Sequence, residues 1–270
     1  MKLAPWQIGL LAIAILIGCV LFSTFHTGWK PPQNPNPSEI FKEAKADAAA
    51  GKYADALAKH VWFHQNALKY DEGLYGVRLS YALDDWVELG AKYPPALKKL
   101  RSIRDGAAEK VRVGKDIREP FNDFESINEA LKENNQTKDL FVWLDATNPI
   151  AAKEVYDLAQ PALIQAKEYK LCGKYIDMAK TFDQILYRYN TAIRVAGDKQ
   201  VVEQKQALIN LAEQSYSEDS ATLVALLVLN ERMGDANWVA DEALKWLNKP
   251  ELKKELEEAK KGQFPPPPIK

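Results

Sequence analysis

Residues 44–56, AKADAAAGKYADA, decide the fold that this sequence predicts. An alanine-rich helical segment stops at Gly51 and another opens at Tyr53, so the stretch predicts two helices joined by a tight turn. The tripeptide Gly-Lys-Tyr recurs at 173–175, again between helical segments, and Gly234 has a comparable place further along. We therefore expect helical hairpins in tandem.

Helical periodicity extends over most of residues 38–261, and no stretch alternates between apolar and polar residues as a half-buried strand does. Ser38 and Asn148 are the expected N-caps, because their side chains suit that position. The apolar stripes cover residues 75–93, 97–107, 176–189, 201–212 and 223–227. These patterns predict an all-α domain of stacked antiparallel helical hairpins.

The first Gly-Lys-Tyr and its neighbours resemble the tetratricopeptide repeat family, whose unit of about 34 residues is a pair of antiparallel helices. Small residues fit the family pattern at Ala44 and Ala56, the turn glycine fits at Gly51, and an aromatic residue fits at Tyr53. The resemblance implies a curved array whose groove binds a peptide or a helix of a partner protein.

The later copies of the pattern are degenerate. In the second, Ala166, Gly173 and Tyr175 fit, whereas Met178 replaces a small residue; in the third only Gly234 fits well. The terminal proline of the family pattern is missing from all copies. The glycines also lie at intervals that are not multiples of the family period, so a generic array of helical hairpins explains these segments equally well.

Residues 3–25 form an uncharged, apolar run bracketed by Trp6 and Trp29. At about 1.5 Å of rise per residue, roughly 20 helical residues cross a hydrocarbon core of about 30 Å. Residues 1–30 therefore predict an uncleaved signal anchor with one transmembrane helix, because Lys2 favours a cytoplasmic N-terminus. The chain is then a single-pass membrane protein whose domain is extracytoplasmic, or periplasmic in a bacterium.

The same run contains a second possibility. Residues 16–19, LIGC, resemble the lipobox of bacterial lipoproteins, in which the signal is cut before a cysteine that is then acylated, so Cys19 is a candidate lipidation site. The apolar run continues past that cysteine through residues 20–22, which favours the anchor. Both alternatives attach the chain to a membrane.

The segments that flank the domain are rich in proline. Four prolines within residues 31–37 predict a semi-rigid linker that holds the domain off the bilayer. The helical-repeat domain then extends over residues 38–261. Residues 262–270 predict a polyproline II tail, either disordered or docked in an aromatic groove of another protein.

Charge and motifs exclude several functions. The 36 basic and 37 acidic residues are interleaved, without the basic stripe of a nucleic-acid binder, and two cysteines exclude a disulfide framework. His60 and His64 share a helical face that could meet a metal, but no motif supplies a third ligand. Asp84 and Asp85 point about 100° apart and cannot share one substrate. We therefore expect no enzyme, metal or other cofactor.

The function that remains is binding. Tyr75, Arg78 and Tyr81 are expected on one helix whose faces cannot all be buried, so this helix is the predicted partner-binding face. The sequence predicts a membrane-tethered, non-catalytic interaction scaffold for a protein partner. The alternative is a helical binding domain for a small apolar ligand or lipid.

Overall fold

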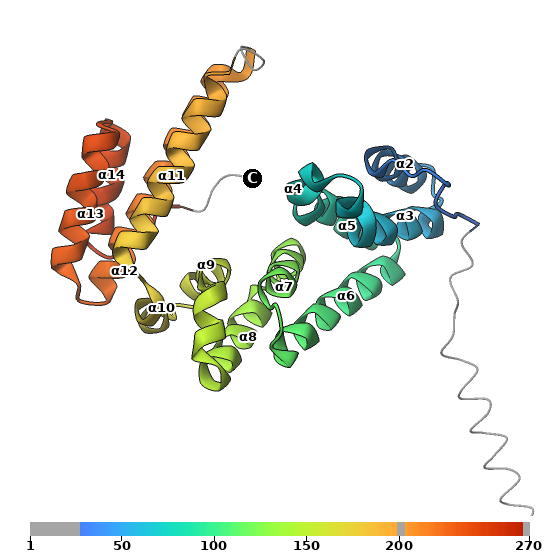
Figure 1. The fold of residues 1–270 in the computed structure, drawn as a ribbon, viewed down its shortest axis with the longest axis horizontal. Coiled ribbons are helices and arrows are strands. Elements are labelled where there is room, and N and C mark those ends of the chain that lie inside the picture. The colour runs from blue at the N-terminus through green and yellow to red at the C-terminus, as the bar shows by residue number, and fades with distance from the viewer. Residues whose placement is uncertain (1–27, 199–202, 267–270) are drawn as a thin grey trace, which may run out of the picture. The chain divides into compact units, whose positions relative to one another are not determined.

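A computed structural model describes residues 28–198 and 203–266, and every regular element in these ranges is a helix (Figure 1). The all-α prediction is therefore confirmed. The chain divides into two compact units. Of the described residues, the first unit comprises 28–109 and 126–133, and the second comprises 110–125, 134–198 and 203–266.

The helices follow one another with short connections. The first unit contains α2 (Pro37–Ala49), α3 (Tyr53–Asn66), the 3-10 turns η1 (Ala67–Lys69) and η2 (Glu72–Leu74), α4 (Tyr75–Leu79) and α5 (Tyr81–Lys92). Two helices contribute residues to both units, namely α6 (Pro94–Val113) and α7 (Arg118–Leu131). The second unit continues with α8 (Asn134–Thr147), α9 (Pro149–Gln165), α10 (Tyr169–Tyr175), α11 (Met178–Ala196), α12 (Lys205–Leu229), α13 (Met233–Trp246) and α14 (Pro250–Ala259).

Four of the helix-to-helix connections use the same turn. In each of these four connections, one residue just beyond the end of the helix has a left-handed conformation, with φ between 59° and 76°. These residues are Gly51, Lys132, Lys167 and Glu231. The N–H of the next residue donates to the carbonyl five positions earlier, over 2.8 to 2.9 Å: Lys52 to Asp47, Glu133 to Asn128, Glu168 to Leu163 and Arg232 to Leu227. This is the Schellman pattern, which satisfies carbonyl groups left over at a helix end.

The first predicted hairpin is confirmed, because Gly51 lies in this turn between α2 and α3. Ala44 and Ala56 are fully buried where those helices pack together. The prediction that Gly173 and Gly234 mark later turns is wrong. Gly173 lies inside α10 and Gly234 inside α13, since Lys167 and Glu231 occupy the left-handed positions instead.

The sequence predicts one helix over residues 75–93, and the structure divides it at Ser80, where φ is −129° and ψ is −98°. The Ser80 hydroxyl donates to the carbonyl of Gly76 over 2.8 Å. A serine that bonds to nearby backbone competes with helical hydrogen bonds, and glycine is a weak helix former. Tyr75 and Arg78 therefore lie on α4, and Tyr81 begins α5.

Two other helix starts test the capping predictions. Asn148 caps α9 as expected, accepting from the N–H of Ala151 over 3.1 Å. Helix α2 starts earlier than expected, because Asn36 rather than Ser38 is its N-cap and accepts from the N–H of Ser38 over 3.0 Å. The proline at position 37 is then the first residue of the helix, a position that needs no donated hydrogen bond.

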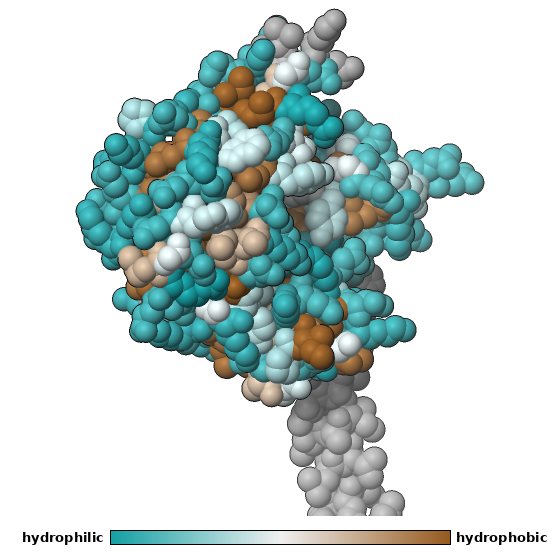
Figure 2. Space-filling view, turned by 60° about the vertical axis from the view of Figure 1, so that its left-hand side comes forward, coloured by the Kyte–Doolittle hydropathy of each residue, from teal (hydrophilic) through white to brown (hydrophobic). Residues whose placement is uncertain are grey.

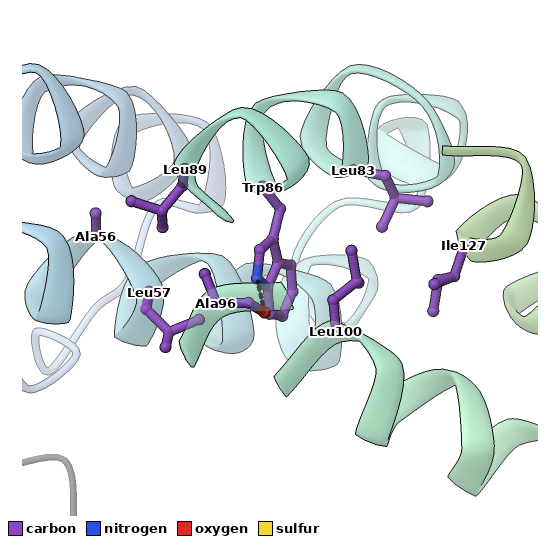
Figure 3. Close-up of a cluster of buried hydrophobic side chains, with 8 residues drawn as sticks. All are labelled: Ala56, Leu57, Leu83, Trp86, Leu89, Ala96, Leu100 and Ile127. Carbon is purple, nitrogen blue, oxygen red and sulfur yellow. Dashed lines mark hydrogen bonds between the residues drawn. The ribbon is translucent and has the colours of Figure 1, made fainter. Parts of the chain in front are cut away.

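Trp86 is the largest fully buried side chain of the first unit, and helices α3, α5, α6 and α7 surround it (Figure 3). Its indole nitrogen donates to the carbonyl of Ala96 over 3.0 Å. The apolar cluster consists of Ala56, Leu57, Leu83, Trp86, Leu89, Ala96, Leu100 and Ile127. In the second unit α12 is the central helix, and it packs against α10, α11, α13 and α14.

In the two described ranges, no helix is both long enough and apolar enough to cross a membrane. The predicted span at residues 3–25 and the candidate lipidation site Cys19 lie outside the described residues. Near the other end, Gly262 ends α14 and the Phe264 ring stacks on Tyr169 of α10, with centroids 5.4 Å apart. This part of the predicted tail contacts the second unit.

Candidate functional site

The structure brings two of the three predicted binding residues together. The guanidinium carbon of Arg78 lies 6.0 Å from the centre of the Tyr75 ring, while Tyr81 on the next helix is 70% exposed. Arg78 itself is buried, and its Nη1 lies 3.3 Å from Nε2 of His64. Only the two tyrosines can offer surface to a partner. The binding site remains a prediction, in which the buried Arg78 packs against the Tyr75 ring and does not itself face the partner.

The two histidines on α3 belong to the core. The His60 ring stacks on Trp86 at 5.7 Å and meets Phe41 edge-on at 6.1 Å, and His64 meets Trp86 edge-on at 6.2 Å. Burial, helped by the Lys45 charge, lowers the pKa of His60 to about 4. Because His60 is only 2% exposed, its neutral imidazole acts as a packed aromatic ring.

The other reactive groups that the sequence singles out are also structural. Asp85 forms an ion pair with Lys45 over 3.1 Å, and Asp84 points to solvent. Burial raises the pKa of the Cys172 thiol to about 11, so it stays protonated at neutral pH. In the part of the chain that the structure describes, no group of three His, Cys, Asp or Glu side chains could hold a metal ion.

A groove between α11 and α12 is the clearest binding geometry in the second unit. Its volume is about 490 Å³. Its apolar lining comes from both helices: Ile185, Tyr189, Ala192 and Val195 on α11, and Leu208, Leu211, Ala212 and Tyr216 on α12. Successive members lie three or four positions apart on α11, so they form one stripe along that helix.

The groove is open to solvent. Leu211 is 60% exposed and Val195 is 50% exposed, although both are large apolar residues. Arg188 of α11 pairs with Asp219 of α12 over 2.8 Å at the rim. From Ile185 to Val195 the stripe is about 15 Å long, at 1.5 Å of rise per residue. On the face that Figure 2 presents, apolar residues reach the surface in patches between hydrophilic ones.

The predicted apolar stripe over 201–212 contained Leu208 and Leu211. A period of three or four residues identifies a helical face that needs covering, and it does not say whether this chain or another molecule covers it. The exposed fraction of these side chains became known only from the structure.

Other hollows lie among the described residues. One of about 430 Å³ lies between α12 and α14, and four glutamates line it: Glu213, Glu218, Glu251 and Glu255. Another of about 390 Å³ lies in the first unit, beside Gly28, the start of α3 and Tyr93.

Comparison with known proteins gave no match: no family model, no curated protein and no solved structure is similar to this chain.

Proposed function

We propose that this chain is a membrane-tethered, non-catalytic scaffold that binds a helix of a partner protein in the groove between α11 and α12. The observation that carries the proposal is the exposure of Val195 and Leu211 within an apolar groove. Apolar side chains that line a concave surface gain free energy when a partner covers them, about 25 cal/mol for each Å² removed from water.

The shape of the groove favours a helix as the partner element. Two helices form its walls, and its apolar stripe is long enough for about three turns of a third helix. An amphipathic helix places apolar anchors at three- and four-residue intervals, which matches the spacing of the stripe on α11. The Arg188–Asp219 pair at the rim offers both charges to the polar edge of such a helix.

The recurring turn supports a tetratricopeptide-like array as the finer architecture. The left-handed residues Lys132 and Lys167 lie 35 positions apart, close to the family unit of about 34 residues, and Glu231 follows 64 positions after Lys167. Arrays of this kind bind peptides and helices on their grooves. The apolar run at residues 3–25 supplies the proposed tether, or Cys19 does so after acylation.

A site-specific photocrosslinker at Val195 in the full-length, membrane-bound chain tests the proposal. We expect one protein adduct, and we expect Leu211→Asp to lower its yield, because a carboxylate in the groove must be desolvated on binding. The matched control carries the crosslinker at Ile150 of α9, which is also strongly exposed. The same adducts from both positions, unaffected by Leu211→Asp, would overturn the proposal.

The alternative function, binding of a small apolar ligand or lipid, is supported by the volume of the same groove. Pockets of about 300 to 1,000 Å³ are typical for small ligands. Mass spectrometry of the purified full-length chain tests it: a stoichiometric lipid that is lost from Leu211→Asp, together with no protein adduct at Val195, would favour this alternative over the scaffold.

A further inference from the structure

One glutamate joins the groove of the proposed function to the hollow that four glutamates line. Glu218 of α12 borders both the groove between α11 and α12 and the hollow between α12 and α14. Leu211, which is 60% exposed in the groove, lies seven positions before Glu218, so both project from nearly the same side of α12. A helix that covers Leu211 therefore has one edge beside Glu218 and the hollow.

Part of the charge around the groove and the hollow is already neutralised. Arg188 of α11 pairs with Asp219 of α12 over 2.8 Å. Lys249 pairs with Glu213 of α12. Among the described residues that line the groove and the hollow, Arg188 and Lys249 are the only basic ones. No lining cation is therefore left for the other glutamates.

Three glutamates keep an unpaired negative charge. Among the described residues, no lysine or arginine forms an ion pair with Glu218, Glu251 or Glu255. Glu218 accepts a hydrogen bond from the neutral side chain of Gln214 over 2.8 Å. Glu255 accepts one from the Ser217 hydroxyl over 2.5 Å. Three negative charges therefore lie on the α12 and α14 side of the groove, whereas the α11 residues that line it include no acid.

This one-sided charge distinguishes between the possible occupants of the groove. Carboxylates beside an apolar surface favour a partner that brings positive charge to the matching edge, and they repel a partner with negative charge there. A second copy of the chain, packed groove to groove, would bring the same three carboxylates. Lysine and arginine have long apolar stems that cover apolar surface while the charged end reaches a carboxylate.

We propose that the groove between α11 and α12 binds a basic amphipathic helix of a partner protein. The apolar face of that helix covers Val195 and Leu211, and lysines or arginines along one of its edges pair with Glu218, Glu251 and Glu255. The inference rests on the proposed function and adds the chemistry of the partner helix. A single exposed ion pair contributes little, but three together predict about tenfold tighter binding than for a neutral helix.

Three synthetic peptides of about 18 residues, or five helical turns, test the proposal. They share an apolar face of leucines and differ only along one edge, which carries lysine, glutamine or glutamate. Fluorescence anisotropy measures their binding to the full-length chain in phosphatidylcholine nanodiscs, with empty nanodiscs as the blank. We expect the lysine peptide to bind about tenfold more tightly than the glutamine peptide, and the glutamate peptide to bind most weakly. The preference should vanish in 1 M salt, where the Debye length is about 3 Å.

Two substitutions on the same helix show whether the glutamates cause the preference. Glu251→Lys should weaken binding of the lysine peptide about threefold. Its matched control is Glu257→Lys, since Glu257 is also exposed on α14 but does not line the hollow, and this change should have no effect. Glu218→Gln, which keeps the size of the side chain, should act in the same direction as Glu251→Lys. Circular dichroism confirms that each variant is folded.

Leu211→Gln separates the groove from its charge, because this substitution is neutral. If all three peptides bind equally well and all lose affinity for Leu211→Gln, the basic partner is wrong and the proposed function stands. If the lysine peptide binds Leu211→Gln as tightly as the original chain, charge alone holds it and the groove is not its site. If no peptide binds, both proposals fail. A crosslinker at Val195 that joins two copies of the chain, or captures a lipid, also rules out the basic helix.

Discussion

Residues 51–53 and 173–175 have the same sequence, Gly-Lys-Tyr, and different structures. Gly51 is left-handed, with φ of 76°, in the turn between two helices, and a Cβ there would meet nothing within 4 Å. Gly173 is helical, and a Cβ there would lie 2.0 Å from Oδ1 of Asn230. Position 51 needs glycine because its backbone is left-handed. Position 173 needs glycine because the side chain of Asn230, 57 positions further along, leaves no room for a Cβ.

The tyrosines differ in the same way. Tyr53 stacks on Tyr93 at the edge of the first unit. Tyr175 packs against Tyr156 at 5.7 Å, and its hydroxyl donates to Asp145. The same tripeptide thus forms a turn in one place and part of a helix in the other, depending on the chain that surrounds it. The two regions can be separated experimentally, because each depends on a different interaction.

The largest expected difference between the two regions is in how much stability each loses in acid. His60 lies on the helix that follows the first Gly-Lys-Tyr, whereas the second unit contains no histidine. The pKa of His60 is about 4 in the folded chain and about 6.5 in an unfolded one, so between these values the unfolded form takes up a proton that the folded form does not. Stability is therefore lost as the pH falls from 6.5 to 4, by about 3 kcal/mol.

Hydrogen exchange at α3 and α12, corrected for the intrinsic effect of pH, measures this loss in each unit. Protection of α3 should fall between pH 6.5 and 4, and His60→Leu should remove that part of the pH dependence. An equal loss at α12, or a pH dependence that His60→Leu leaves intact, would contradict the assignment to His60.

The next effect concerns the second glycine. Gly173→Ala places a methyl group on Asn230, whose Nδ2 donates to the carbonyls of Tyr169 over 2.9 Å and Leu226 over 2.8 Å. Moving that side chain breaks both hydrogen bonds, so we expect a loss of about 2 kcal/mol in urea unfolding.

Asn230→Ala supplies the control for this substitution. In that background the clash is gone, and Gly173→Ala should be neutral or stabilise α10 by up to about 1 kcal/mol, because alanine is the better helix former. Equal effects of Gly173→Ala in both backgrounds would show that Asn230 is not the cause.

A smaller loss is expected at the first glycine. Gly51→Ala meets no atom but forces a Cβ into the left-handed region, which costs about 1 kcal/mol. The same urea unfolding measures it, and no second substitution near the turn should restore the loss. A second-site rescue would mean that contacts, rather than backbone conformation, decide this position as well.

The smallest effect is expected from the opposite kind of substitution, in which glycine replaces a left-handed residue. Lys167→Gly relieves the left-handed strain of a lysine in the same turn, while the unfolded chain gains freedom, so the net gain is about 0.5 kcal/mol. A small rise in the thermal midpoint measures it. A fall in the midpoint would show that the Lys167 side chain stabilises the turn by more than its strain.

Local patterns predicted much of the fold. The Asn148–Pro149 helix start, the turn at Gly51 and the buried Leu83, Trp86 and Leu89 follow from capping preferences and helical spacing. The break at Ser80 and the turns at Lys167 and Glu231 were not predicted, because the apolar spacing continues across Ser80, and lysine and glutamate rarely adopt the left-handed conformation.

The candidate site was less predictable. Tyr75 and Tyr81 are exposed as a binding face requires, but Arg78 is buried beside His64, and no local signal separates an arginine that faces solvent from one that supports a core. The groove between α11 and α12 includes Leu208 and Leu211 of a predicted apolar stripe, but the spacing of those residues did not indicate a groove at this place. Exposure depends on which helices pack together, and that is a property of the whole unit.

The sequence by itself determined that the chain is helical, where most of its helices lie and that an apolar run precedes the domain, because periodicity and composition are local. Only the tertiary structure decided what the two Gly-Lys-Tyr segments do, which apolar residues stay exposed and where Trp29 packs. These outcomes depend on residues far apart in the chain, such as Gly173 with Asn230 and Trp29 with Lys59, that only folding brings together.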